Sequence, residues 1–142
     1  MNVLLDTNIL LDILVPGRPC SRESAIIFQT ARQSSLEAFM TTQSILDAAY
    51  VVAKSPGYDP ALFRETISGL LRYINIHGID SFNLRNAIRT SEVNDIEDCS
   101  QIYFANEYHC SIIITSDRRF PLPAKLKGLT VLTPQEFVSH LK

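Results

Sequence analysis

Cysteine is scarce in this sequence, and its few cysteines form no recognisable motif. Cys20, Cys99 and Cys110 include no CxxC pair and no Cys/His spacing typical of a structural zinc site. An odd number of cysteines also argues against a disulfide framework. We therefore expect free thiols, which suit a reducing compartment, and a cytoplasmic protein.

Long apolar runs are missing as well. No stretch reaches the roughly 18 uninterrupted apolar residues that a membrane helix needs. The N-terminal region carries acids at positions 6 and 12 but no lysine or arginine. These features argue against a signal peptide, and we expect no membrane partner.

The chain also lacks a large charge excess and the common nucleotide-binding loops. Its net charge is −2, which excludes binding to nucleic acid through bulk positive charge but leaves room for a locally basic groove. Neither GxxxxGK[ST], GxGxxG nor GxSxG occurs. With 142 residues, 46% of them hydrophobic, we expect one globular domain over residues 1–142.

What the sequence does contain is an alternation of short apolar runs and helical patterns. We predict strands at residues 2–6, 36–40, 74–79, 111–115 and 130–132. Helices are expected at residues 9–14, 21–32, 42–53, 60–73, 81–91 and 95–109, and from 133 onward. The expected helix caps are Thr7 or Asn8, Ser21 or Ser24, Thr41 or Thr42, Asp95, and Thr133. This alternation is typical of an α/β fold with a parallel sheet covered on both faces.

Four carboxylates stand out because their neighbours are apolar. Asp6 and Asp117 come just after predicted strands, at the strand ends where open α/β sheets place their ligands. Asp98 lies in the first turn of the helix that leads to the strand before Asp117. Asp47 is the only charge between residues 41 and 53. All four elements can present their acids at the same edge of the sheet.

Each acid also has a simpler interpretation when it is taken alone. Asp47 can lie on a thin solvent face of its helix, and Asp98 can favour the helix dipole. Asp95 is best interpreted as a cap and Glu97 as solvated. Asp12 either lines the polar face of the first helix, which is the favoured interpretation, or supports the site from behind the other acids. The ordered combination of four acids favours a shared site.

Converging carboxylates raise one another's pKa or recruit a cation. Carboxylate oxygens without His or Cys suit Mg²⁺ or Mn²⁺, and such a site can hydrolyse phosphodiester bonds. We expect Asp6 and Asp98 to contact the ion directly and Asp117 to hold its bound waters. Asp47 is expected either to ligate a second ion or to orient the attacking water.

At these residues the sequence resembles the PIN domain family, in particular the VapC-type toxin ribonucleases of bacterial toxin–antitoxin modules. LLDTNILLD resembles the first motif, an acid ending strand one and followed by Thr-Asn. TTQSILDAAYVV is similar to the second acidic helix. NDIEDCSQIYFANEYHCSIIITSDRRF resembles the third and fourth motifs, including Thr-x-Asp, and TVLTPQEFVSHL is similar to the end of many members.

The resemblance implies a three-layer, Rossmann-like PIN fold with a parallel sheet of about five strands. It also implies a Mg²⁺- or Mn²⁺-dependent endoribonuclease, a homodimer and an antitoxin that blocks the groove. We expect Asn8 and Thr115 to support the site. The apolar residues of 21–32 and 61–73 are candidates for the dimer interface.

Two positions depart from the family pattern. Asp47 stands where the family usually has Glu, and Ser116 stands where many relatives have Arg. Arg118 and Arg119 follow at once, and they either bind substrate phosphates or lie solvated in a turn.

Two other functions stay open at this point. One is a catalytically weak PIN-like module that binds RNA or a protein partner, which the shorter Asp47 side chain keeps in play. The other is a phosphatase or phosphoacceptor domain with Asp6 as nucleophile. The absence of an evident lysine after a late strand argues against the second.

Overall fold

Five parallel strands form the centre of the molecule, as the alternating pattern predicts. The computed structural model describes residues 1–123, 126 and 128–142. The strands are β1 (Asn2–Leu5), β2 (Glu37–Thr41), β3 (Asn75–His77), β4 (Ile112–Ile114) and β5 (Thr130–Leu132), in the order β3-β2-β1-β4-β5. Val3 lies opposite Ala38 on one side and Ile112 on the other. β1 is therefore the central strand.

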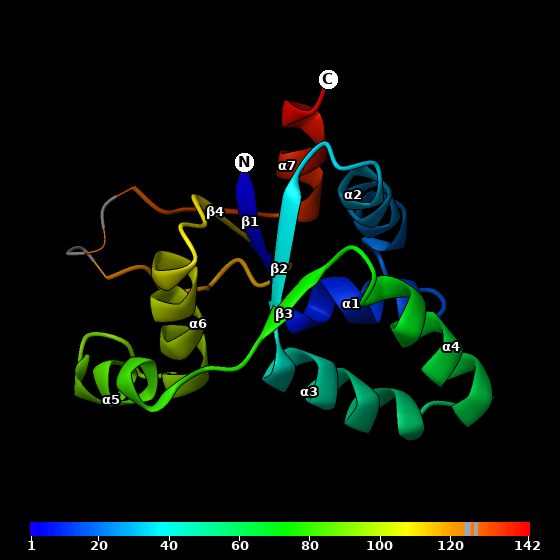
Figure 1. Ribbon diagram of the computed structural model, residues 1–142, viewed down its shortest axis with the longest axis horizontal. Helices are drawn as coiled ribbons and strands as arrows, with labels where there is room; N and C mark the ends of the chain where they lie inside the picture. The colour runs from blue at the N-terminus through cyan, green and yellow to red at the C-terminus, as the bar shows by residue number, and fades with distance from the viewer. Residues whose placement is uncertain (124–125, 127) are drawn as a thin grey trace.

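Helices cover both faces of this sheet. They are α1 (Thr7–Leu14), α2 (Ser21–Arg32), α3 (Thr42–Ala53), α4 (Pro60–Leu70), α5 (Ser81–Arg89), α6 (Ile96–Glu107) and α7 (Pro134–His140). α1 packs against α2 and α3, and α2 packs against α7, whereas α5 packs against α6 on the other side (Figure 1). No helix in the described part of the chain has the length and apolar character needed to span a membrane.

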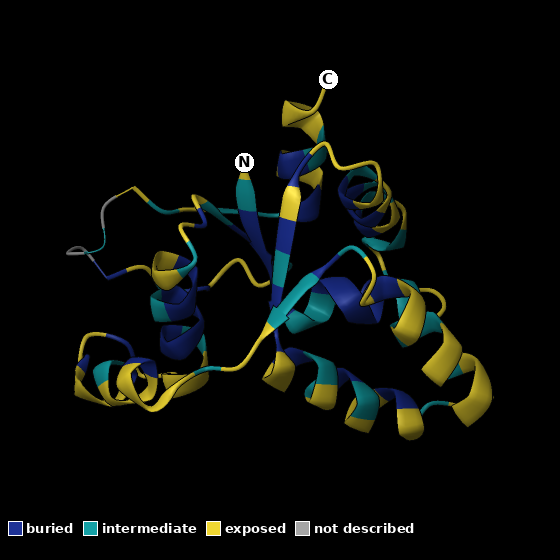
Figure 2. Ribbon diagram, in the orientation of Figure 1, coloured by how far each residue is buried: buried dark blue, intermediate teal, exposed yellow. Residues whose placement is uncertain are grey.

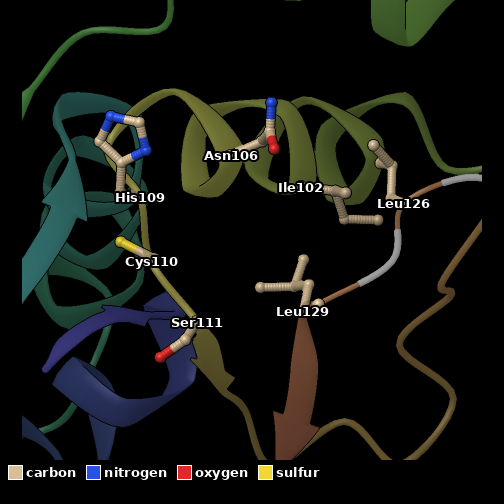
Figure 3. A pocket seen from close by; sticks show the side chains of 8 residues that line it. Ile102, Asn106, His109, Cys110, Ser111, Leu126 and Leu129 are labelled. Atoms are coloured by element: carbon tan, nitrogen blue, oxygen red, sulfur yellow. The ribbon is translucent and has the colours of Figure 1, made fainter.

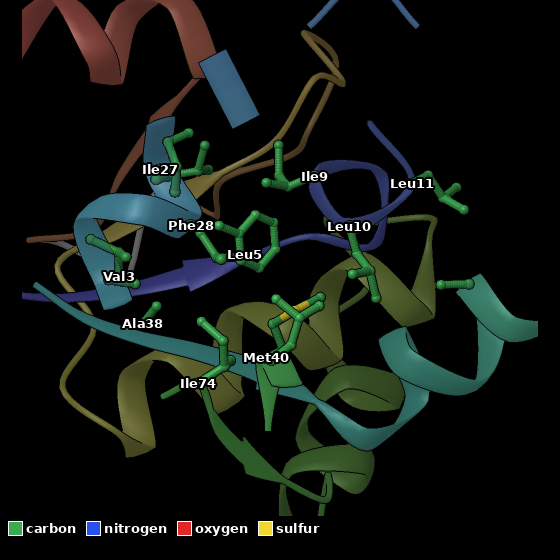
Figure 4. Packing of buried hydrophobic residues seen from close by; sticks show 14 of the residues in the cluster. Val3, Leu5, Ile9, Leu10, Leu11, Ile27, Phe28, Ala38, Met40 and Ile74 are labelled. Atoms are coloured by element: carbon green, nitrogen blue, oxygen red, sulfur yellow. The ribbon is translucent and has the colours of Figure 1, made fainter. Parts of the chain in front are cut away.

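The apolar run of β1 is buried on both faces, which is why it shows no polar alternation. Val3 and Leu5 belong to the core under α1 and α2, where the side chains of α2 point toward β1 (Figure 4). Leu4 packs on the opposite face against Ile102 of α6 and Ile113 of β4. Figure 2 shows the buried residues concentrated along the sheet and on the inner sides of the helices.

The helix caps explain where several elements begin. Thr41, Asp95 and Thr133 cap α3, α6 and α7 as predicted, and Thr133 forms a capping box with Glu136. Two predicted caps are wrong. α1 begins at Thr7 because Asp6, rather than Thr7 or Asn8, is its cap. α2 follows Cys20, which forms no side-chain cap bond, so neither Ser21 nor Ser24 has that role.

Most predicted elements extend a few residues beyond the observed ones. α4 ends at Leu70 rather than at 73, and β3 contains only Asn75–His77 of the predicted 74–79. The contribution of α2 to a dimer interface stays a prediction: Ile27, Phe28 and Ala31 lie in the core, whereas Ala25 is exposed and Ile26 is half-buried. On α4, Leu62 is exposed and remains available.

A buried ion pair fixes the loop between α1 and α2. Asp12 on α1 is only 3% exposed. Its Oδ1 accepts a hydrogen bond from Arg18 Nε at 2.8 Å, and its Oδ2 accepts one from Ser24 Oγ at 2.7 Å. Asp12 thus does not lie on a polar helix face as its simpler interpretation predicts; it is a buried structural residue that fixes the position of the Arg18 guanidinium.

Removing Arg18 is expected to destabilise the protein. Arg18→Ala leaves the Asp12 carboxylate buried without a counter-charge, and the free energy of unfolding should fall by about 2 kcal/mol in urea denaturation. Arg22→Ala, at an exposed position of α2, is the control and should change it by less than about 0.5 kcal/mol. Equal effects of the two substitutions would contradict this role of the ion pair.

Candidate active site

The carboxyl ends of neighbouring strands bring the predicted acids to one edge of the sheet. Asp6 follows β1, and Asp117 lies just beyond β4. Asp47 lies on α3, which follows β2 directly, and Asp98 lies in the first turn of α6. In Figure 1 this edge faces the space between the starts of α3 and α6.

Four hydrogen bonds hold the Asp6 carboxylate, which is 8% exposed. Its Oδ1 accepts from the Thr7 backbone N at 2.7 Å and from Gln101 Nε2 at 3.1 Å. Its Oδ2 accepts from Thr115 Oγ1 at 2.8 Å and from Asn8 Nδ2 at 3.1 Å. All four donors are neutral, so they orient the carboxylate without cancelling its charge.

Asn8 and Thr115 link the Asp6 site to the loop after β4. The Asn8 side chain also accepts a hydrogen bond from Ser116 N at 3.0 Å. Thr115 Oγ1 donates to Asp6 and accepts from Asp117 N at 3.0 Å. The structure therefore brings both predicted supporting residues into contact with Asp6, and through them it fixes the backbone before Asp117.

Asp98 lies close enough to other acids for its titration to change. Burial is the largest cause that raises the pKa of Asp98 to about 6, followed by the negative charges of Asp95, Asp6 and Asp117. Asp95 is also the cap of α6, since its Oδ1 accepts from Asp98 N at 2.9 Å. The raised pKa of Asp98 thus reflects its closeness to the negative charges of Asp95, Asp6 and Asp117.

Glu97 is exposed, as its solvated interpretation predicts, but it lies close to the same group of acids. Partial burial raises the pKa of Glu97 to about 7, and the neighbouring Asp47, Asp6 and Asp95 carboxylates contribute to the rise. Asp47 is half-buried, and its Oδ1 accepts a hydrogen bond from Gln43 Nε2 at 2.8 Å. The influence of Asp47 on the pKa of Glu97 indicates that the two carboxylates lie near each other, on α3 and at the start of α6. We call Asp6, Asp47, Glu97, Asp98 and Asp117 the acid cluster.

The loop after β4 carries the exposed part of the site. Asp117 is exposed, and its Oδ1 accepts from Arg119 N at 2.9 Å. The side chains of Arg118 and Arg119 are exposed as well. Their predicted contact with substrate stays a prediction, but Arg118 lines a hollow with Asp117 and Thr115.

The chemistry of the acid cluster fits a hard divalent cation. Its donors are carboxylate oxygens, and the carboxamide oxygen of Gln101, buried beside Asp6, has no hydrogen-bond partner in the described part of the chain. Within that part, no three His, Cys, Asp or Glu side chains converge closely enough to enclose an ion by themselves. Mg²⁺ retains several waters and takes only one or two protein carboxylates, so it does not need such a group.

A second hollow, of about 210 Å³, lies at the other end of α6 and has a different character. It is lined by Ile102, Asn106, His109 and Cys110 together with residues that precede β5 (Figure 3). Burial raises the pKa of the Cys110 thiol to about 12, which makes it a poor nucleophile at neutral pH. No carboxylate lines this hollow, so the acid cluster is the stronger candidate site.

Comparison with known families decides the identity of the fold. The family model of the PIN domain matches residues 2–119. The chain belongs to the PIN domain family. No curated protein matches this PIN domain at the sequence level. PIN domains of this type are nucleases that generally use divalent metal ions.

Solved structures share the fold at low sequence identity. VapBC2 from Rickettsia felis, bound to a promoter DNA fragment, is 13% identical with a TM-score of 0.64, covering 94% of this chain and 98% of its own. VapC20 from Mycobacterium tuberculosis, a toxin that cleaves the sarcin–ricin loop, is 10% identical with a TM-score of 0.65, covering 83% and 92%. A toxin–antitoxin complex from Klebsiella pneumoniae is 20% identical with a TM-score of 0.62, covering 93% and 97%.

The raised pKa values predict an unusual pH dependence of stability in the metal-free PIN domain. Between about pH 4 and 7, folding favours protonation of Asp98 and Glu97, so their contribution to the free energy of unfolding falls as pH rises. Asp98→Asn should therefore stabilise the protein at pH 8 by about 1 kcal/mol, after allowance for solvent screening, and have little effect near pH 4. Urea denaturation of the wild type and of Asp98→Asn at pH 4 and pH 8, with a chelator present, measures these two effects.

The matched control for this prediction is Glu65→Gln, at an exposed position of α4. It removes one carboxylate away from the acid cluster and should give no pH-dependent gain. A loss of stability at pH 8 in Asp98→Asn would contradict the repulsion that we assign to the cluster.

Proposed function

We propose that this PIN domain is a metal-dependent endoribonuclease and the toxin of a toxin–antitoxin module. The observation that carries the proposal is the acid cluster at the carboxyl edge of the sheet. Within the described residues, the only ion pair joins Arg18 to Asp12, so no basic side chain there neutralises the cluster. Uncompensated carboxylates in this arrangement suit Mg²⁺ or Mn²⁺.

The side chains around the site have distinct roles in this proposal. Asp6 and Asp98 would hold the ion, Asp117 would position its water shell, and Asp47, with Glu97 near it, would orient the attacking water and accept its proton. Asn8 and Thr115 keep Asp6 in one orientation. When bound, a divalent ion lowers the pKa of a coordinated water and stabilises negative charge on the phosphate.

Glu97 offers an answer to the departure from the family pattern at position 47. Asp47 is one methylene shorter than the usual Glu, but its charge raises the pKa of Glu97, which indicates that a second carboxylate lies near it. This pairing favours an active enzyme over the catalytically weak module.

A nucleophilic role for Asp6 is disfavoured. The sequence has no evident lysine after a late strand, which a phosphoacceptor domain with an aspartate nucleophile would use. The phosphatase interpretation therefore has little support in this site.

The proposed partners follow from the toxin assignment. The similar Klebsiella pneumoniae structure is a toxin–antitoxin complex, which supports an antitoxin partner for this chain. A homodimer stays a prediction, and exposed Leu46 and Tyr50 on α3 and Phe82 and Ile88 on α5 are apolar surface available to it. The cytoplasmic location also stays a prediction from the free thiols.

Loss of either central acid is expected to abolish cleavage. Asp6→Asn and Asp98→Asn remove charge where the ion binds, so each should lower the rate of Mn²⁺-dependent cleavage of a mixed RNA substrate by a factor of about 100 or more. The measurement compares both variants with the wild type in Mn²⁺ and in chelator. Circular dichroism checks that the variants fold.

Glu65→Gln on α4 is the control and should cleave at the wild-type rate. Cleavage that persists in chelator, or that survives both Asp substitutions, would disprove the metal-dependent mechanism. Binding of RNA by the wild type without any cleavage in Mn²⁺ would favour the weak-module alternative.

A further inference from the structure

Another cavity lies beside the acid cluster, at the carboxyl edge of the sheet, and its electrostatic character is opposite to that of the cluster. It has a volume of about 300 Å³ and is lined by Arg18, Arg118, Ser116, Thr133 and Gln135, among others. Ser116 and Arg118 follow β4, and Thr133 and Gln135 follow β5. The cavity therefore lies at the ends of β4 and β5, next to the acids at the ends of β1 and β4.

The two arginines leave donors free in this cavity. Arg18 uses its Nε for the bond to Asp12, so within the described residues its two terminal nitrogens have no hydrogen-bond partner. Arg118 forms no hydrogen bond or ion pair with any described residue, although its charge lowers the pKa of Glu136 on α7. Asp12, the acid that lines the cavity, has both oxygens occupied by Arg18 and Ser24.

A buried hydroxyl gives an independent indication of a missing ligand. Ser116 Oγ is inaccessible to solvent and has no hydrogen-bond partner in the described part of the chain. A buried hydroxyl without a partner costs free energy, so such groups usually meet a ligand or a water. Ser116 lines the same cavity as the two arginines.

We propose that this cavity binds a backbone phosphate of the RNA, next to the phosphate that is cleaved at the acid cluster. Guanidinium groups and hydroxyl donors are the groups that bind phosphate oxygens in proteins. The strand order places Asp47, Asp6, Asp117 and then the arginine cavity in sequence along one edge. A linear polyanion lying across the strand ends meets the acid cluster and the cavity in turn.

This inference rests on the proposed ribonuclease function for the choice of RNA as the polyanion. Arg18 and Arg118 supply the positive charge in the cavity that Ser116 also lines. The bond from Ser116 N to Asn8 joins the cavity to the hydrogen bonds around Asp6.

The decisive experiment measures binding of a short single-stranded RNA in chelator, where cleavage does not occur. Arg118→Gln should weaken binding several-fold at low salt and reduce the slope of log affinity against log salt by about 0.7, the value for one lost phosphate contact. Ser116→Ala should weaken binding without loss of fold, since its hydroxyl makes no bond in the described part. Arg72→Gln, at an exposed position of the turn after α4, has the same change in charge and should bind like the wild type.

Inorganic phosphate provides a readout that does not depend on nuclease function. At equal ionic strength it should raise the melting temperature above its value in chloride by more in the wild type and in Arg72→Gln than in Arg118→Gln, where only the general stabilising effect of phosphate remains. Unchanged RNA binding and phosphate response in both cavity variants would overturn the proposal, even if the wild type cleaves RNA. If Arg118→Gln weakened only the binding of an acidic protein partner, RNA would be the wrong occupant.

A wild type that fails to cleave RNA but shows the Arg118-dependent phosphate response would refute the nuclease proposal alone. The cavity would then stand as a phosphate site.

Discussion

The Asp6 carboxylate is buried at the end of the central strand, and the arrangement of the site depends on how its charge is held. Its four hydrogen bonds come from α1, α6 and the segment after β4. One charged group thus fixes three segments that are far apart in the sequence. Neutral donors satisfy its oxygens but leave a full negative charge in a poorly solvated place.

The remaining acids gather around that charge instead of avoiding it. The pKa values of Asp98 and Glu97 rise because burial and neighbouring carboxylates disfavour their ionised forms. A protein gains no stability from such repulsion, so the arrangement is more easily explained by function than by folding. A bound divalent cation would turn the repulsion into attraction and lower the same pKa values.

Much of this could be predicted from the sequence because the relevant signals are local. Val3, Leu4 and Leu5 form an apolar run that suits a strand buried on both faces, and Asp6 ends it. Parallel strands share one carboxyl edge, so Asp6 and Asp117 had to lie near each other once both strands were recognised. Thr133, Pro134 and Glu136 signal the start of α7 through well-known capping preferences.

Other features depend on tertiary contacts that no local pattern contains. Glu97 has the sequence surroundings of a solvated residue in the first turn of a helix, and only the tertiary arrangement of α3 and α6 brings Asp47 near it. Gln101 shows no sequence signal for its contact with Asp6, since a polar residue inside a helix is common. The sequence marks Asp6 as a site residue but not as the cap of α1, because Thr7 and Asn8 are also good caps.

The central claim is that the acid cluster exists to hold a divalent cation. Calorimetric titration of Mn²⁺ into the metal-free protein tests it most directly, at pH 6 and pH 8 and in two buffers with different ionisation enthalpies. The account predicts saturable binding that releases protons at pH 6, releases far fewer at pH 8, and is lost in Asp6→Asn. Absence of saturable binding at millimolar Mn²⁺, or binding that Asp6→Asn leaves unchanged, would contradict it.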